Sequence, residues 1–344
     1  MFLISYFRPP AKRPKFEENQ IAELSNDVIA YILSFLPFPT TFGVAAQLSR
    51  SWSKIVRSLE FLSHIKHLSF RLCRPYNLYD KETRLNIFNM SSKCQNIEWI
   101  NVRNLNFNLD ELIKFLTPIA SKLLHLDISE STFDDPLALI KILKLCPNLI
   151  NLQAAKVRIR TKSIKTPEEI KDQQSIKAES NDATSFVHEK LQILSLHKTF
   201  IPLDSIQQVL AATPNAVEID VWGTYMGPVA IIESLFGKRR FRSLDLTDVV
   251  VLENVAPWEK IFENSGDSLK QLSLRRGLIV PEKFKLLMDH CTELTELDLW
   301  GNSTLTSESL RVITKFRDMK FLNLADCKVN EEVSLHLLLP ATNI

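Results

Sequence analysis

The sequence predicts an α/β solenoid, in which a curved parallel sheet carries helices on its outside and a small all-helical segment precedes it. Three observations predict this fold class. A short apolar pattern returns about every 25 residues over most of the 344-residue chain, and a helix-compatible stretch follows each copy. Residues 24–56 lack this repeat and place their apolar residues at helical spacing instead.

The repeated pattern is a six-residue segment with apolar residues at its first, fourth and sixth positions. Alternation of this kind predicts a short strand that buries one side. The clearest copies start at intervals of 25, 25, 28, 25 and 25 residues. Together with weaker copies toward the N-terminus they make about ten units, at residues 65–70, 97–102, 123–128, 149–154, 191–196, 216–221, 241–246, 269–274, 294–299 and 319–324.

The stretch after each strand has the signals of a helix. Asp135 is suited to cap a helix with Pro136 in its first turn, and Pro281 opens another such stretch. One strand–helix unit cannot bury its apolar side alone, so stacked units have to share a continuous core. This pattern resembles the leucine-rich-repeat family, and we assign residues 63–344 to a solenoid of that kind.

The five cysteines are in phase with the repeat. Cys94, Cys146 and Cys291 each precede a unit by three residues, and Cys73 and Cys327 each follow a unit's first residue by eight. Such positions suit small buried side chains, and no spacing typical of metal ligands is present. We therefore expect free, buried thiols.

One interval between units is too long for the repeat. From residue 149 to residue 191 there are 42 residues, and the excess is polar, charged with both signs and free of aromatic residues. Such a composition is typical of a mobile surface loop. We expect an insertion loop near residues 158–190.

Composition excludes several classes of function. The net charge is +2, which gives no bulk attraction to nucleic acid, and no apolar run is long enough to span a membrane. Seven glycines form no phosphate-binding loop. Residues 1–20 are expected to be a disordered, basic, proline-rich tail, in which residues 9–15 resemble a short nuclear import signal. We expect a cytoplasmic or nuclear protein, or one found in both.

Residues 21–62 are predicted to form a helical module. Two or three short amphipathic helices barely make a core by themselves, so their apolar sides need a partner. The segment resembles the F-box, and the residues that carry the resemblance are Leu24, Asp27, Val28, Ile32, Leu33, Ser34, Phe35, Leu36 and Pro37, followed by Leu48, Ser49, Arg50 and Trp52.

The resemblance implies a function. F-box proteins bind the Skp adaptor of Skp–cullin–F-box ubiquitin ligases and present a target protein with their other end. The chain would then be a non-catalytic substrate-recognition subunit. The alternative is a leucine-rich-repeat interaction scaffold whose helical front end only caps the solenoid. By resemblance, the adaptor contact falls on Leu24, Val28, Ile32, Leu33, Leu36 and Pro37.

The concave side of the sheet offers candidate substrate contacts. The residue after each unit's sixth position should face this side, and there Trp222 and Trp300 share a column with His197 and Arg275. Tryptophan and arginine are enriched at interface hot spots. We predict that these four residues bind a protein substrate, and neighbouring aspartates suggest a basic or extended peptide. The alternative is that each ring lies flat against its neighbours.

No catalytic, cofactor-binding or metal-binding constellation is predicted. His290 and Cys291 are adjacent, but Cys291 is in core phase, so the pair does not indicate a nucleophile and its base. An enzyme whose insertion loop covers a site on the concave side is a second rival interpretation. It lacks any paired acid and base in the sequence.

Overall fold

The computed structural model describes residues 24–34, 50–70, 93–105, 107–160, 186–224, 236, 239–248, 256–277 and 279–328. The chain divides into two compact units, the first ending at Ile65 and the second beginning at Lys66. Among the described residues, none of the helices combines the length and apolar character needed to cross a bilayer.

The first unit is helical. Its described helices pack against one another and bury Ile29, Leu33, Ile55, Phe61 and Leu62. Two serines set where helices begin: Ser25 Oγ accepts from the Val28 N–H (3.4 Å), and Ser58 Oγ accepts from the Phe61 N–H (3.2 Å). The helices are α1 (Asn26–Ser34), α4 (Arg50–Val56) and α5 (Leu59–His64).

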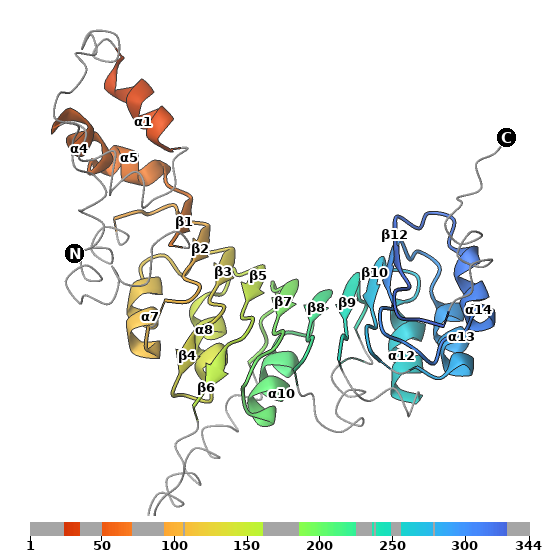
Figure 1. Cartoon of the computed structure of the whole chain (residues 1–344). Helices are drawn as coiled ribbons and strands as arrows, with labels where there is room; N and C mark the ends of the chain where they lie inside the picture. The colour runs from red at the N-terminus through yellow and green to blue at the C-terminus, as the bar shows by residue number, and fades with distance from the viewer. Residues whose placement is uncertain are drawn as a thin grey trace, which may run out of the picture. The chain divides into compact units, whose positions relative to one another are not determined.

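The second unit is built on one long parallel sheet. Its ten strands follow the chain in order, and every neighbouring pair is parallel (Figure 1). Each strand begins at the third position of a predicted unit and pairs with the same position of the next, which confirms the repeat and the solenoid. The strands are β1 (His67–Ser69), β2 (Trp99–Asn101), β3 (His125–Asp127), β5 (Asn151–Gln153), β7 (Ile193–Ser195), β8 (Glu218–Asp220), β9 (Ser243–Asp245), β10 (Gln271–Ser273), β11 (Glu296–Asp298) and β12 (Phe321–Asn323).

Helices cover one face of this sheet, and we call the other face the open face (Figure 1). As predicted, Pro281 starts a helix, whereas the helix after Pro136 begins only at Ala138. Asp135 accepts from the Leu137 N–H (2.7 Å) just ahead of that helix rather than capping it. The helices are α7 (Leu109–Leu116), α8 (Ala138–Leu145), α10 (Leu203–Ala212), α12 (Ala256–Ser265), α13 (Pro281–His290), α14 (Ser307–Leu310) and the 3-10 helix η3 (Arg311–Lys315).

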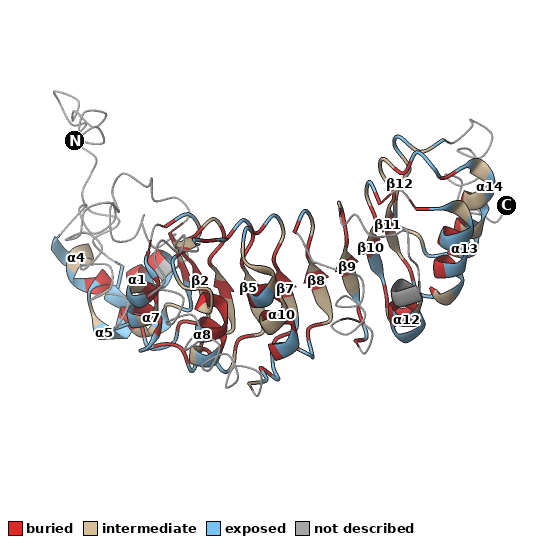
Figure 2. Ribbon diagram, turned by 90° about the horizontal axis from the view of Figure 1, so that it is seen from below, coloured by how far each residue is buried: buried red, intermediate tan, exposed pale blue. Residues whose placement is uncertain are grey.

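The core lies between the sheet and the helices. In β11 the central Leu297 is buried, while Glu296 and Asp298 on the open face are half-buried. Figure 2 shows α8 and α13 with buried and exposed sides, as amphipathic helices have.

The cysteines in repeat phase lie in this core. Cys94, Cys146 and Cys291 are thiols outside any disulfide and are fully buried, as predicted, and burial raises the pKa of each thiol to about 12. Cys327 is half-buried, and Cys73 lies outside the described residues. The buried thiols are therefore protonated at neutral pH and act as small apolar side chains.

The start of the predicted insertion is ordered. Arg158–Ile159 forms strand β6, which pairs with β4 (Thr132–Phe133), and Arg158 also bridges to Phe200. The Arg160 N–H still donates to the Phe133 carbonyl (2.9 Å). The prediction of a loop was therefore wrong for residues 158–160. They pair as a strand because Ile159 supplies a buried apolar side chain behind the main sheet. Residues 161–185 lie outside the described residues.

In nine successive units the eighth residue has a left-handed backbone, with φ between 51° and 76°. It comes directly after the residue that follows the unit's sixth position and lies on the open face. Two of the nine are glycine and three are Asn or Asp, which tolerate this conformation, so the strain falls mainly on the other four, Glu130, Lys156, Lys198 and Arg276. In eight of the nine the N–H donates to a carbonyl of the next unit and extends the strand pairing by one bond. The nine are Asn104, Glu130, Lys156, Lys198, Gly223, Asp248, Arg276, Gly301 and Asp326.

Candidate interaction surfaces

Helix α1 presents apolar side chains to solvent. Leu24, just before the helix, is 40% exposed, Val28 is 43% exposed and Ile32 is 48% exposed. Tyr31 beside them is 67% exposed and lines a 420 Å³ hollow between α1, α4 and α5. Three predicted adaptor contacts thus form an apolar stripe, which we call the α1 stripe: Leu24, Val28 and Ile32.

The other predicted adaptor contacts are placed differently. Leu33 is only 1% exposed and belongs, with Ile29, to the buried side of α1. A surface contact does not fit this position, because residues four apart share one face of a helix and this face is turned inward. Leu36 and Pro37 lie outside the described residues.

The aspartates on the open face accept hydrogen bonds from backbone N–H groups just after each strand. Asp220 Oδ1 accepts from the Trp222 N–H, and Asp298 Oδ1 accepts from the Trp300 N–H, each at 3.1 Å. The same bond to the N–H two residues on is made by Asn101, Asp127, Asp245 and Asn323. This bond stabilises the turn out of the strand. The recurrence of Asp or Asn at the fifth position of these units is therefore explained by these backbone hydrogen bonds. It does not require a basic ligand.

Asp245 is one of these fifth-position residues and is half-buried. Burial raises the pKa of its carboxyl, and the charge of Asp220 adds to this, whereas hydrogen bonds from Thr247 and Ser273 oppose it. A raised pKa in the folded state favours folding fully below the unfolded value of about 3.9, and this contribution is lost as the pH rises through the folded value. At neutral pH the ionised carboxylate therefore costs stability.

Asp245→Asn should consequently raise the melting temperature at pH 7. The asparagine Oδ1 can still accept from the Thr247 N–H, which now lies 2.9 Å from the aspartate oxygen. The gain should shrink as the pH falls through the raised folded pKa and be lost below about 3.9, where the aspartate is neutral in both states. Thermal melts followed by circular dichroism at pH 7 and pH 3.5 measure both. Asp127→Asn is the control and should bring no gain, because Asp127 accepts a hydrogen bond from Asn101 (2.9 Å); a larger difference at pH 3.5 would contradict the argument.

Trp222 is held on several sides by its own chain. The Lys198 Nζ lies 4.0 Å from the ring centroid, and the His197 ring stacks on it at 5.7 Å and 29°. The indole Nε1 donates to Asp248 Oδ2 (3.0 Å). The ring is half-buried as a result, and a cation already occupies its face.

Trp300 has a matching environment. The Arg275 and Arg276 guanidinium carbons lie 4.7 Å and 5.1 Å from its ring centroid. Arg275 also lies 3.6 Å from Asp298. As with Trp222, cations come from the neighbouring strand end and cover the ring.

Asp248 joins the two clusters. Its Oδ2 accepts from the Trp222 Nε1 and also from the Arg276 Nη2 (2.5 Å). The predicted residues His197, Trp222, Arg275 and Trp300 are therefore brought into one network, which we call the tryptophan network. Sequence reasoning missed its linking members Lys198, Asp248 and Arg276, although each stands at the eighth position of its unit. Because cations of the chain cover the rings, a basic peptide would compete with them.

A Ser–His–Asp group at the edge of this network is not a catalytic triad. Ser195 Oγ lies 3.1 Å from His197 Nδ1, and Asp220 Oδ2 lies 2.9 Å from the same nitrogen. A triad needs the nucleophile and the acid on opposite ring nitrogens, so that the imidazole can pass a proton. Here both partners use one nitrogen, and the group is suited to positioning His197 against Trp222.

Comparison with known proteins supports the two-part organisation. The F-box domain family matches residues 21–64. A chain of the yeast Rad7–Elc1 complex shares the fold with a TM-score of 0.59 and 15% identity, over 91% of this chain and 85% of that chain. The leucine-rich-repeat-containing protein LegL7 from Legionella pneumophila (TM-score 0.43, 18% identity, 76% and 85% covered) and an internalin from Listeria monocytogenes (0.43, 12%, 91% and 92%) are more distant. No curated protein sequence matches the chain.

The fold and the helical module thus define a protein of the F-box and leucine-rich-repeat class. This chain carries an F-box domain at residues 21–64, followed by a leucine-rich-repeat solenoid with a ten-stranded parallel sheet.

Proposed function

We propose that the chain is the substrate-recognition subunit of a Skp–cullin–F-box ubiquitin ligase. Its F-box would bind a Skp-type adaptor, and its solenoid would hold a target protein. The observation that carries this proposal is the α1 stripe, which lies inside the segment matched by the F-box family. Exposed apolar side chains in a row on one small module are typical of a docking surface. Such a role belongs in the cytoplasm or the nucleus.

The tryptophan network is the proposed target-binding site. It combines two tryptophans and two arginines, the residue types that dominate binding energy at protein interfaces. The cations over the rings favour a target that brings acidic groups to Lys198, Arg275 and Arg276. No chemistry is required of the chain itself, because holding a target near the ubiquitin-conjugating enzyme raises its effective concentration.

A second type of adaptor is also worth testing. The similar yeast fold comes from a complex of Rad7 with Elc1, so an Elc1-type adaptor is the natural alternative to a Skp-type one. The likeness is one of fold, and the same α1 stripe would serve either adaptor. A binding experiment should therefore offer both.

Val28→Asp tests adaptor binding. A carboxylate in the middle of an apolar interface loses its hydration without gaining a partner, so the affinity should fall by at least about 100-fold, on the order of 3 kcal/mol. Val187→Asp is the matched control, because Val187 is a valine of similar exposure (48%) in the second unit. Isothermal titration calorimetry with each purified adaptor measures the affinities, and thermal melts check that both variants fold.

The outcomes separate the candidates. If Val28→Asp loses binding to the Skp-type adaptor and Val187→Asp keeps it, the ligase role is supported. If only the Elc1-type adaptor gives this result, an Elc1-type adaptor replaces the Skp-type one in the proposal. If the folded native chain binds neither adaptor, the helical module is a cap of the solenoid and the scaffold interpretation holds. Leu33→Ala is unsuitable for this purpose, since it would remove a buried side chain and destabilise the module.

A further inference from the structure

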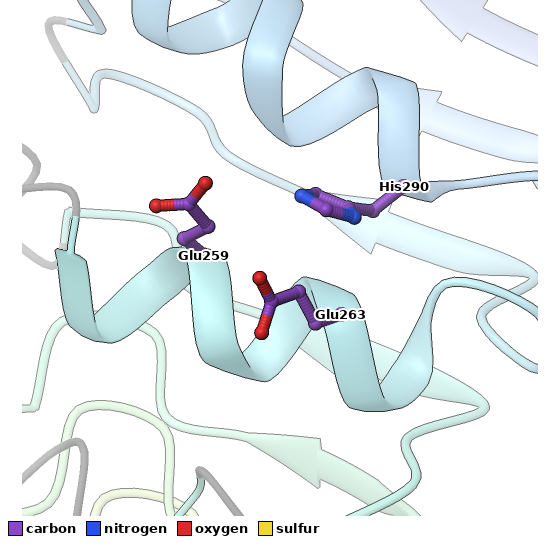
Figure 3. Close-up of side chains that lie close together, drawn as sticks. All are labelled: Glu259, Glu263 and His290. Atoms are coloured by element: carbon purple, nitrogen blue, oxygen red, sulfur yellow. The ribbon is translucent and has the colours of Figure 1, made fainter.

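Three side chains that can bind metal meet on the helix side of the solenoid. Glu259 and Glu263 lie one turn apart on the same side of α12, and His290 is the last residue of α13. One potential ligand atom from each lies within 4.8 Å of the other two. Figure 3 shows the His290 ring directed from α13 toward the two carboxylates.

The polar atoms of this cluster have no partners within the described part of the chain. His290 Nε2 is buried and makes no hydrogen bond there. Neither glutamate forms an ion pair there, and the nearby Lys315 instead contacts Asp289 (3.5 Å) and the Met288 carbonyl. A buried nitrogen without a hydrogen bond costs about 1–3 kcal/mol, and like charges one helical turn apart repel. A cation bound between the three side chains would offset both costs.

The position of His290 is fixed by close packing of the two helices. The Gly266 carbonyl, just beyond α12, accepts from the Thr292 N–H (3.0 Å). A Cβ atom at Gly266 would lie 2.0 Å from the His290 carbonyl oxygen, so only glycine permits this approach. Because Gly266 is three residues after Glu263, the contact also sets the distance from the imidazole to the glutamates.

We propose that Glu259, Glu263 and His290 bind a divalent transition-metal ion of the Zn²⁺ type. An imidazole nitrogen with carboxylate oxygens is a common zinc ligand set, and a water molecule would complete the tetrahedron. Ligand atoms bonded to one ion at about 2.0–2.2 Å lie about 3.0–3.5 Å apart, so the side chains have to close by roughly 1 Å. Glu263 is exposed, which gives the ion a path from solvent. None of these three residues was predicted as a metal ligand from the sequence.

The proposed ion would connect two consecutive repeats. Helix α12 follows β9 and α13 follows β10, so the three ligands come from neighbouring units. An ion bound only by the folded chain stabilises it in proportion to its affinity. The site lies behind the sheet, away from the open face, and does not depend on adaptor or target binding.

Zinc titration of the full-length protein tests this proposal. After dialysis against a chelator, calorimetry with ZnCl₂ should show one ion per chain, and thermal melts should show a higher melting temperature with zinc. Glu263→Gln removes an exposed ligand and should weaken zinc binding by at least about tenfold, since even the loss of outer hydrogen-bond partners costs 10–100-fold. Glu282→Gln, an exposed glutamate in the first turn of α13, is the control and should bind as the native chain does.

Three results would overturn the proposal. They are the absence of one-to-one zinc binding, equal zinc affinity of the native and Glu263→Gln chains, and Mg²⁺ binding as tightly as Zn²⁺. The last result would show that His290 takes no part, since Mg²⁺ prefers oxygen ligands. His290→Asn supplies a second variant: it should lose the zinc-dependent rise in melting temperature and keep the melting temperature of the metal-free protein within a few degrees.

Discussion

Gly266→Ala should destabilise the second unit by about 2–3 kcal/mol or more. The new methyl carbon would lie 2.0 Å from the His290 carbonyl oxygen, 2.6 Å from its carbonyl carbon and 2.8 Å from the Phe262 carbonyl oxygen. All three atoms belong to backbone, which cannot turn aside as the end of a flexible side chain does. Urea unfolding followed by circular dichroism measures the loss of unfolding free energy.

The neighbouring position provides the control for this prediction. Asp267→Ala changes an exposed residue whose Cβ is already present and removes only a surface ion pair with Arg240. Such pairs contribute about 0–1 kcal/mol. If Gly266→Ala cost no more than Asp267→Ala, the close approach of α12 to His290 would be wrong.

Arg239→Met should cost about 2–4 kcal/mol of unfolding free energy. Arg239 is only 5% exposed, and its guanidinium donates to the carbonyls of Leu210 in the last turn of α10, of Thr213 just after it (2.5 Å) and of Ala216 in the following loop (3.4 Å). A helix leaves its last carbonyls without internal partners, and a cation there also meets the negative end of the helix dipole. Methionine fills similar space but removes these charge-assisted hydrogen bonds, and the Leu210 and Thr213 oxygens then keep only the backbone N–H donors of Thr213 and Ala216 (3.2 Å each) and a longer bond from the Thr213 hydroxyl.

Two further variants separate this effect from loss of charge or volume. Burial lowers the pKa of Arg239 to about 10, so it is still protonated at pH 7. Arg239→Lys keeps a cation but loses the planar fork, so it should recover part of the stability. Arg240→Met removes an exposed arginine and should cost below about 1 kcal/mol in the same urea titration. Equal losses for Arg239→Met and Arg240→Met would contradict the capping role.

The strands were predictable because their signal is local. The alternation within six residues shows which side of each strand is buried. Leu297 could therefore be predicted as buried, and Glu296 and Asp298 as lying on the open face, without knowledge of the neighbouring units. Pro281 indicated the start of its helix for the same reason. The start of the insertion was not predictable, because Ile159 is buried through pairing with Thr132–Phe133, a contact that alternation within one unit does not show.

The candidate sites depend on contacts between units, and there the sequence was less informative. Both sides of α1 are apolar, so spacing alone could not tell the exposed Ile32 from the buried Leu33. The column of Trp222, Arg275 and Trp300 was visible, but two of the three cations over the rings, Lys198 and Arg276, come from left-handed residues whose side-chain direction follows from backbone geometry. The meeting of His290 with Glu259 and Glu263 requires the relative rotation of two helices, which no single repeat encodes.

The in-register sheet also acts as a ruler for any extended partner lying across it. Parallel strands present one residue of each column about every 4.8 Å, whereas an extended chain advances about 3.3 Å per residue. The two periods nearly coincide when three partner residues, about 10 Å, span two strands, about 9.6 Å. A partner crossing the strands from Trp222 would therefore meet the same column again three residues on, at every second strand, where Arg275 follows β10. The spacing of the strands therefore favours partners whose contact residues recur at every third position. This requirement comes from the backbone and does not depend on which side chains make the contacts.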